Sequence, residues 1–348
     1  MRKFVLPLCL SSVLAVGAFA HTDDKLPAPA DDTKVTVAVT TGSGAQTFQT
    51  VPNWASIPDK LTLGPTHGGI VIDKKGIIYV STDSPKGIYV FSADGTVLRT
   101  MAPEFSGTHG MCIREENGEE VIYGAHLRGA QVVKLTLEGK PLLTIPYPKE
   151  ANVYPEGKGY SPTAVAVAPN GDIFVADGYG KSLIHKFDST GKYIKTFGSK
   201  GSEPGQFSTC HGIVIDSRSG TPLLLVCDRE NRRLQHFDLD GNFVAVITQD
   251  LRRPCSASIS GDNVAIAELE GRVAIIDKTN AVVATLGDNP DKGQWAKFDV
   301  APQWWKTGIF TAPHGISYDA QGNLYVQDWN KTGRVSKLVK APATAAAR

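Results

Sequence analysis

The sequence lacks an excess of charge of either sign. It contains 36 Lys and Arg residues against 35 Asp and Glu residues, which gives a formal net charge of +1 at pH 7. Proteins that bind nucleic acids or anionic membranes depend on clustered positive charge. The balance found here gives no sign of such a basic footprint, and we expect neither a nucleic-acid partner nor a membrane partner.

Cysteine is also scarce. The chain has five cysteines and no C-x-x-C spacing, which excludes a dithiol redox motif of that kind. Cys9 lies near the amino terminus, and the remaining four are Cys112, Cys210, Cys227 and Cys255. In an oxidising compartment these four can pair in three ways, and their spacing alone does not choose among them.

The apolar run at the amino terminus is too short to indicate a membrane span. Residues 1–20 begin with Arg2 and Lys3, continue with this run and end in Ala18-Phe19-Ala20, an A-x-A cleavage pattern. We interpret the segment as a secretory signal peptide that is removed after Ala20. The mature protein is therefore expected to be periplasmic or secreted.

What the sequence does contain is an internal repeat. Between residues 205 and 247, four apolar runs alternate with turn compositions rich in Gly, Asp, Asn and Pro, which is typical of an antiparallel meander. The start of the first strand recurs at residues 66–76, 108–118, 163–171, 210–220, 254–261 and 313–322. Six copies of one four-stranded meander predict an all-β fold, a six-bladed β-propeller.

The repeat also divides the chain into segments. We expect the signal peptide at 1–20, a disordered lead-in at 21–34, the propeller at 35–340 and a disordered tail at 341–348. The sixth copy has only three strands, so its fourth should come from 35–39 or nearby and close the ring. Insertions at 141–161 and 288–310 precede first strands, which places them on the face where the axial funnel opens. We also expect a monomer.

Three histidines share one register in alternate copies. His109, His211 and His314 occupy the same position at the start of the first strand in copies two, four and six. In copy one that position is held by Gly68, and His67 comes one residue early. Because a one-residue slip in a strand turns a side chain to the other face, we do not expect His67 to point where the other three do, and we set it aside. At a strand mouth it could still lie close to them.

These histidines predict a metal centre. The innermost strands of a propeller line its axis, so imidazoles on alternate blades converge from about 120° apart, as the symmetry of a closed ring requires. Three protein ligands with an open fourth position are the arrangement of a catalytic zinc site. The alternative is that the imidazoles only form hydrogen bonds at the strand mouth. Cys210 and Cys255 lie close enough to the axis to be extra ligands or small buried fillers.

Further candidate residues lie in the loop after the second strand of each copy, which opens on the same face. Asp177, Asp228 and Asp328 recur at one position and are expected to tie down the turn. Other residues of these loops do not recur, so no requirement of the repeat explains them. Among them Tyr179 is a candidate general base, Arg229 a candidate carboxylate clamp, and Arg128 and Trp329 are candidates for substrate binding.

Residues 161–243 carry a resemblance to a known family. This stretch, which includes PTAVAVAPNGDIFVADGYGKS and DRENRRLQHF, resembles the peptidyl-α-hydroxyglycine α-amidating lyases, within the NHL-repeat propellers. The resemblance is looser, though in register, from 108 to 338. It implies a carbon–nitrogen lyase that splits an N-acyl-α-hydroxyglycine into an amide and glyoxylate. It further implies Zn²⁺ held by His109, His211 and His314, with Tyr179 as base and Arg229 on the substrate.

The sequence departs from the family's pattern at several positions. Gly180 and His236 stand where the family's two disulfides each need a cysteine. Gly315 stands where the family's calcium site uses an aspartate, so a structural calcium is not expected. Copy one has no convincing counterpart of the family's first-blade arginine.

Two other functions remain open. One is a non-catalytic propeller that binds a protein or a glycan, with Trp295, Trp304 and Trp305 of the second insertion as anchors. The other is a metal-dependent hydrolase of the lactonase type, which relies on carboxylate and Asn ligands to calcium. Imidazoles suit zinc better than calcium, so we favour a small-molecule or peptide substrate acted on by a zinc lyase.

Overall fold

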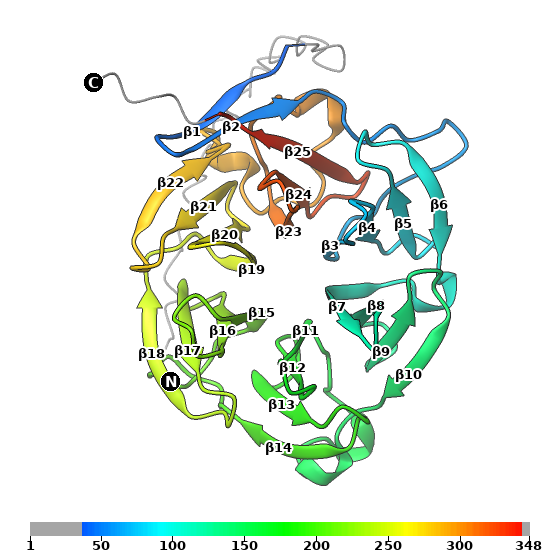
Figure 1. The fold of residues 1–348 in the computed structure, drawn as a ribbon, viewed down its shortest axis with the longest axis vertical. Helices are drawn as coiled ribbons and strands as arrows, with labels where there is room; N and C mark the ends of the chain where they lie inside the picture. The colour runs from blue at the N-terminus through cyan, green and yellow to red at the C-terminus, as the bar shows by residue number, and fades with distance from the viewer. Residues whose placement is uncertain (1–36, 343–348) are drawn as a thin grey trace, which may run out of the picture.

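The computed structural model describes residues 37–342, which form a ring of six β-sheets around a central axis (Figure 1). The predicted all-β, six-bladed propeller is confirmed. The expected signal peptide at 1–20, the lead-in at 21–34 and residues 343–348 of the expected tail lie outside the described residues.

Each of the first five sheets consists of four antiparallel strands that follow one another along the chain. Blade one contains β3 (Ile70–Ile72), β4 (Ile78–Ser81), β5 (Ile88–Phe91) and β6 (Val97–Met101); blade two contains β7 (Thr108–Glu116), β8 (Glu119–His126), β9 (Gln131–Thr136) and β10 (Pro141–Ile145). Blade three contains β11 (Ala164–Val167), β12 (Ile173–Asp177), β13 (Leu183–Phe187) and β14 (Tyr193–Phe197). Blade four contains β15 (Cys210–Asp216), β16 (Leu223–Asp228), β17 (Arg233–Phe237) and β18 (Phe243–Thr248); blade five contains β19 (Pro254–Ser260), β20 (Asn263–Glu268), β21 (Arg272–Ile276) and β22 (Val282–Leu286).

The sixth sheet joins the two ends of the propeller. Its strands, in spatial order, are β23 (Pro313–Tyr318), β24 (Leu324–Asp328), β25 (Arg334–Lys340), β2 (Gln46–Val51) and β1 (Thr40–Ser43). The strand that pairs with β25 is therefore β2, not the segment 35–39 suggested by the sequence, of which 37–39 are not in a strand and 35–36 lie outside the described residues. Antiparallel pairing of β2 with β25 closes the ring, because it supplies the strand that the sixth repeat lacks.

Alternate side chains of each strand pack against opposite neighbouring blades. In β16, Leu224 and Val226 lie in the core shared with blade three, whereas Leu225 and Cys227 lie in the core shared with blade five. All four side chains are completely buried. This is the two-residue period of a strand that is covered on both faces, and it explains why the second strands read as continuous apolar runs.

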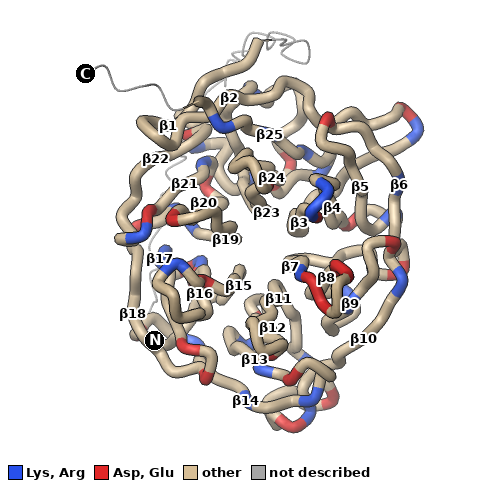
Figure 2. The backbone as a smooth tube through the Cα atoms, in the orientation of Figure 1, with Lys and Arg blue, Asp and Glu red and all other residues tan. Residues whose placement is uncertain are grey.

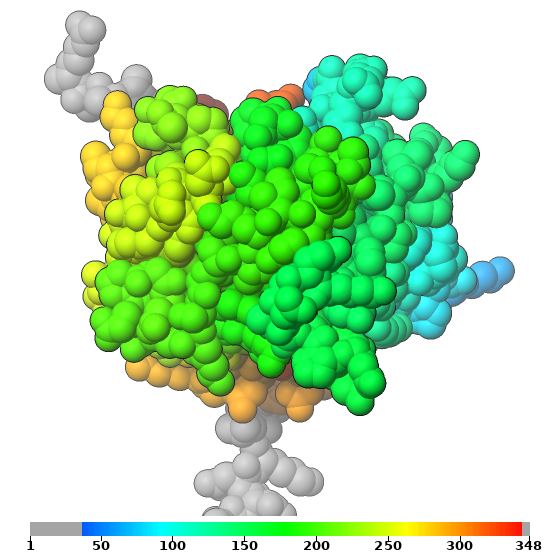
Figure 3. Space-filling view, turned by 90° about the horizontal axis from the view of Figure 1, so that it is seen from below, coloured from blue at the N-terminus to red at the C-terminus, as the bar shows by residue number. Residues whose placement is uncertain are grey.

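The two insertions carry most of the short 3₁₀ helices. These are η2 (Pro103–Phe105), η3 (Lys149–Ala151), η4 (Pro155–Gly157), η5 (Lys292–Gln294) and η6 (Pro302–Trp304). The first insertion begins after Ile145 and not at Pro141, because Pro141–Ile145 forms the outer strand of blade two. In Figure 3, which shows the ring from the side, the orange segment around residue 300 projects at the lower rim.

The recurring aspartates fasten the loops that follow the second strands, as predicted. Asp177 accepts hydrogen bonds from the Ser161 amide at 2.7 Å and from the Lys181 amide at 2.6 Å. Asp328 likewise accepts from the amides of Thr311 and Ala312. Each carboxylate therefore joins the end of a second strand to the segment that leads into the first strand, and it holds the mouth of its blade in place.

Charged residues are dispersed around the propeller. Figure 2 shows Lys and Arg interspersed with Asp and Glu along the ring, without a basic stripe. Within residues 37–342, no helix has the length and apolar character needed to cross a membrane.

Closure by β2 predicts a large cost for truncating its buried aromatic side chain. Phe48 is 0% exposed and packs between blades five and six, so Phe48→Ala should lower the free energy of unfolding by about 3–5 kcal/mol. Val283→Ala, on the exposed face of β22, should cost no more than about 0.5 kcal/mol. Urea unfolding measures both, and equal costs would contradict a structural role for β2.

Candidate metal centre

Each of the three predicted histidines lies at a β-bulge. The pairing of β15 with β16 passes from Cys210 directly to Gly212, and that of β23 with β24 passes from Pro313 to Gly315. A similar shift in β7 brackets His109. A bulged residue leaves the ladder and its side chain is redirected, which explains how an imidazole on an inner strand can point to the axis.

The same ring nitrogen of each histidine is held by the neighbouring blade. Nδ1 lies 2.6 Å from the Thr163 carbonyl in His109, 2.8 Å from the Cys255 carbonyl in His211 and 3.1 Å from the Gly68 carbonyl in His314. A carbonyl can only accept, so Nδ1 carries the hydrogen and Nε2 presents its lone pair. Blades two, four and six thus supply imidazoles, and blades three, five and one supply the carbonyls that orient them.

The glycine after each histidine is required by these contacts. A Cβ atom on Gly212 would lie 2.3 Å from the Cys255 carbonyl oxygen, and one on Gly110 would lie 2.6 Å from that of Thr163. On Gly315 it would lie 2.9 Å from the Gly68 oxygen. The recurring His-Gly pair therefore reflects close approach of adjacent inner strands, because only glycine leaves room for the accepting carbonyl.

The three imidazoles form a nearly equilateral triangle on the axis. Their ring centroids are 4.8, 4.8 and 4.7 Å apart, and the side chains are almost completely buried. Nε2 of His109 and Nε2 of His314 are buried without a hydrogen-bond partner. Beside the triangle, the first strands of all six blades line a cavity of about 60 Å³. Unpartnered buried nitrogens are costly in a native protein and call for a ligand.

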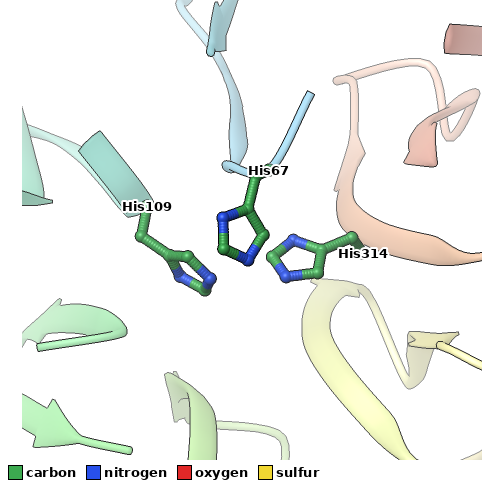
Figure 4. Close-up of side chains that lie close together, drawn as sticks. All are labelled: His67, His109 and His314. Atoms are coloured by element: carbon green, nitrogen blue, oxygen red, sulfur yellow. The ribbon is translucent and has the colours of Figure 1, made fainter. Parts of the chain in front are cut away.

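His67, which the sequence set aside, belongs to this cluster. Its ring centroid lies 4.8 Å from that of His109 and 5.0 Å from that of His314, and the three side chains converge in Figure 4. The prediction was wrong because β3 begins only at Ile70, so His67 precedes the strand and the alternation of strand faces does not apply to it. The direction of the His67 side chain therefore becomes visible only in the folded loop.

Potential ligand atoms fall into two overlapping groups. His67, His109 and His314 form one, and His211, Cys255 and His314 form the other, with all ligand atoms of a group within 4.8 Å of one another. Both groups are found among the described residues, and neither contains a carboxylate. Cys255 thus lies within reach of the axis, whereas Cys210 is in neither group.

Tyr179 and Arg229 lie against the triangle, as the sequence suggested. The Tyr179 hydroxyl is 2.9 Å from Nε2 of His211 and 3.3 Å from Nε2 of His67. Nη1 of Arg229 donates to the same hydroxyl at 3.1 Å, and its guanidinium lies over the phenol ring. A phenol, a guanidinium and the imidazoles therefore meet at one point.

The two residues predicted to bind substrate lie further out. The ring centroid of Trp329 is 6.0 Å from that of His67, so this indole borders the cluster. Arg128 does not reach the imidazoles, because its guanidinium donates to Ser106 Oγ at 3.1 Å and to the Asp83 carbonyl at 3.5 Å. Arg128 instead supports the loop that carries Asp83, whose carboxylate faces His67.

Comparisons with known proteins agree with this architecture. Residues 163–268 match the protein family described as "6-bladed beta-propeller". A probable peptidyl-alpha-hydroxyglycine alpha-amidating lyase of Caenorhabditis elegans is 31% identical over 172 residues, which cover 47% of this chain and 45% of the relative. Peptidyl-alpha-hydroxyglycine alpha-amidating lyase 2 of Drosophila melanogaster is 38% identical over 200 residues, which cover 52% and 43%. The predicted resemblance to the amidating lyases is confirmed.

These matches have a limited extent. The chain spans less than half the length of either amidating lyase. A solved gluconolactonase from Xanthomonas campestris superposes with a TM-score of 0.60 over 88% of this chain and 98% of that chain, at 12% sequence identity. At this identity the likeness shows the shared fold alone.

The positions that depart from the amidating-lyase pattern have other structural roles. A Cβ on Gly180 would lie 2.1 Å from an Asp177 carboxylate oxygen, so no side chain fits there without a shift. His236 lies 2.9 Å from the Asp216 carboxylate. All four cysteines of the described chain are free thiols. The sites of the family's disulfides are thus occupied by a tight turn and by a contact between a histidine and an aspartate.

Burial controls the protonation of the triangle. It lowers the pKa of His109, His211 and His314 well below the ordinary value of 6.5, and the neighbouring positive groups lower it further. The imidazoles are therefore neutral over the physiological range and available as ligands.

This protonation predicts a pH dependence of stability in the metal-free protein. Below about pH 6.5 the unfolded chain binds protons that the folded chain excludes, so the free energy of unfolding should fall by up to about 1.4 kcal/mol per pH unit for each such histidine. Denaturant unfolding in chelator between pH 7.5 and 5.5 measures the slope, and His314→Gln should reduce it. An equal slope in both proteins would contradict the lowered pKa.

Proposed function

We propose that this protein is a zinc-dependent carbon–nitrogen lyase that splits an N-acyl-α-hydroxyglycine into an amide and glyoxylate. The observation that carries the proposal is the meeting of three anchored imidazoles with the Tyr179 hydroxyl, which is itself hydrogen-bonded to Arg229. The similarity to amidating lyases over about half the chain supports the reaction class.

The donor set fits zinc. Nδ1 of each imidazole is held from behind, Nε2 faces the axis, and two of these Nε2 atoms have no partner among residues 37–342. Oriented neutral imidazoles are preferred ligands of zinc, whereas calcium takes carboxylate and carbonyl oxygens. The absence of a carboxylate from both ligand groups of the described chain therefore disfavours a calcium-dependent hydrolase of the lactonase type.

The residues around the axis can perform the proposed cleavage. Bound zinc would act as a Lewis acid on the substrate hydroxyl. Tyr179 accepts the hydroxyl proton as the carbon–oxygen double bond of glyoxylate forms and the carbon–nitrogen bond breaks. The electron pair of that bond passes to nitrogen, which takes up the proton that Tyr179 accepted and leaves as the amide. Arg229 pairs with the substrate carboxylate through its guanidinium.

The protonation of Tyr179 sets a condition on this chemistry. Burial raises its pKa to about 12, although the Arg229 guanidinium opposes this shift. The phenol therefore holds its proton at neutral pH in the metal-free protein. Proton acceptance by Tyr179 is accordingly expected only when cationic charge is present at the axis.

The tryptophans of the second insertion give little support to a binding module. The indole nitrogens of Trp295 and Trp305 donate to the carbonyls of Asn289 and Val300, inside the same insertion. Trp304 is exposed. Two of the three proposed anchors are thus used to hold the insertion together.

We further propose that the protein is exported through residues 1–20 and acts as a monomer on a small-molecule or peptide substrate. The basic start, the apolar run and the Ala18-Phe19-Ala20 pattern support export. Each blade ends in an outer strand of only four to six residues, and such short edges are compatible with a monomer.

Glyoxylate release tests the proposed reaction directly. The zinc-loaded protein should release glyoxylate from an N-acyl-α-hydroxyglycine, and a chelator should abolish the release. His211→Ala should lose both zinc and activity, while Val283→Ala should keep both. Zinc-loaded protein that releases no glyoxylate above the uncatalysed background would rule out the lyase.

Tyr179→Phe separates catalysis from metal binding. General base catalysis contributes roughly 10²- to 10⁴-fold, so kcat should fall by about that factor. Zinc content should be unchanged, because Tyr179 is not one of the residues proposed to bind zinc. Metal analysis and steady-state kinetics check both values, and simultaneous loss of zinc and activity would mean that Tyr179 has a structural role.

A further inference from the structure

His67 has the geometry of a metal ligand. Its distances to the rings of His109 and His314, 4.8 and 5.0 Å, match the 4.7–4.8 Å spacing within the triangle. Zinc–nitrogen bonds of about 2.0–2.1 Å place two tetrahedral ligand nitrogens about 3.3–3.4 Å apart. The ligand atoms of these three residues already lie within 4.8 Å of one another, so small side-chain movements would bring them to one ion.

His67 also has an acceptor group behind it, at a longer distance than the carbonyls behind the other three histidines. Its Nδ1 lies 3.5 Å from Oδ2 of Asp83, on the loop that follows the second strand of blade one. The other three histidines have a backbone carbonyl at this position. A carboxylate behind an imidazole fixes the ring and raises its basicity toward a metal, which leaves Nε2 of His67 on the inner side of the cluster.

Solvent exposure distinguishes His67 from the triangle. Its side chain is 20% exposed, whereas His109, His211 and His314 are only 2–3% exposed. Its Nε2 lies 3.3 Å from the Tyr179 hydroxyl, which also contacts His211. His67 is therefore the imidazole nearest to solvent, and it lies beside the group that is proposed to act on substrate.

We propose that His67 is a fourth, displaceable ligand of the metal centre, held by Asp83, and that it fills the coordination position to which substrate binds. The inference rests on the metal centre proposed above. It differs from a three-histidine site with an open position, because His67 would hold the resting ion together with the axial imidazoles, and substrate would replace the most exposed of them.

Cobalt binding to the metal-free full-length protein tests this ligand without any assay of activity. The visible absorption of bound Co²⁺ reports on its ligands. His67→Gly should shift this absorption and weaken Co²⁺ binding by at least tenfold, and added free imidazole should restore the wild-type spectrum by entering the vacated space. Asp83→Asn should weaken binding by about 10- to 100-fold, as expected for loss of an outer partner.

The control is His236→Gln, which changes a histidine on β17 that contacts Asp216 and lies outside both ligand groups. It should leave the cobalt spectrum and the affinity unchanged. Circular dichroism of each metal-free variant verifies folding. If His67→Gly does not fold, Asp83→Asn provides the test.

The outcomes separate this inference from the proposed function. Identical cobalt spectra and affinities for wild type and His67→Gly, or the lack of any effect of imidazole, would contradict the assignment of His67 as a fourth ligand. A wild-type protein that binds no cobalt would overturn the metal centre as well. A protein that binds metal through His67 but releases no glyoxylate would leave the ligand assignment standing and remove only the lyase.

Discussion

The hydrogen bond from each axial imidazole to a carbonyl of the next blade is the interaction on which the site depends. His211 is held by Cys255 of blade five, and His314 by Gly68 of blade one. The second of these contacts crosses the junction between the last blade and the first. Its geometry depends on the joining of these two blades, to which the Thr66–Asn330 bridge and the Gln327 side chain also contribute. The pairing of β2 with β25 completes the last blade, so the closing strand supports the site although it contributes no functional side chain.

The site is built by small changes to a structural repeat. A bulge turns the side chain inward, and a glycine after it allows the neighbouring strand to approach closely. Blade five has the same bulge but carries Cys255, which adds a thiol to the same space. Blade one provides a carbonyl through Gly68 and an additional imidazole through His67, so the blades share an architecture but not a chemical role.

Burial keeps the imidazoles of the cluster neutral and also destabilises it. Neutral imidazoles whose Nε2 atoms lack partners forgo hydrogen bonds that water would supply, which costs about 1–3 kcal/mol for each unsatisfied group. The positive guanidinium of Arg229 further disfavours their protonation. These nitrogens keep their lone pairs available for a ligand, which is the compromise between stability and activity that functional sites commonly show.

The sequence by itself determined the number of blades, the register of His109, His211 and His314, and the loop positions of Tyr179 and Arg229. These features follow from periodicity, because a repeated meander places equivalent residues at equivalent points of a closed ring. Only the tertiary structure decided the closing strand and the place of His67 and Asp83. The closing strand lies before the first of the six copies, and His67 and Asp83 lie in loops of blade one. The direction of a loop side chain depends on contacts with distant parts of the chain, not on the local pattern.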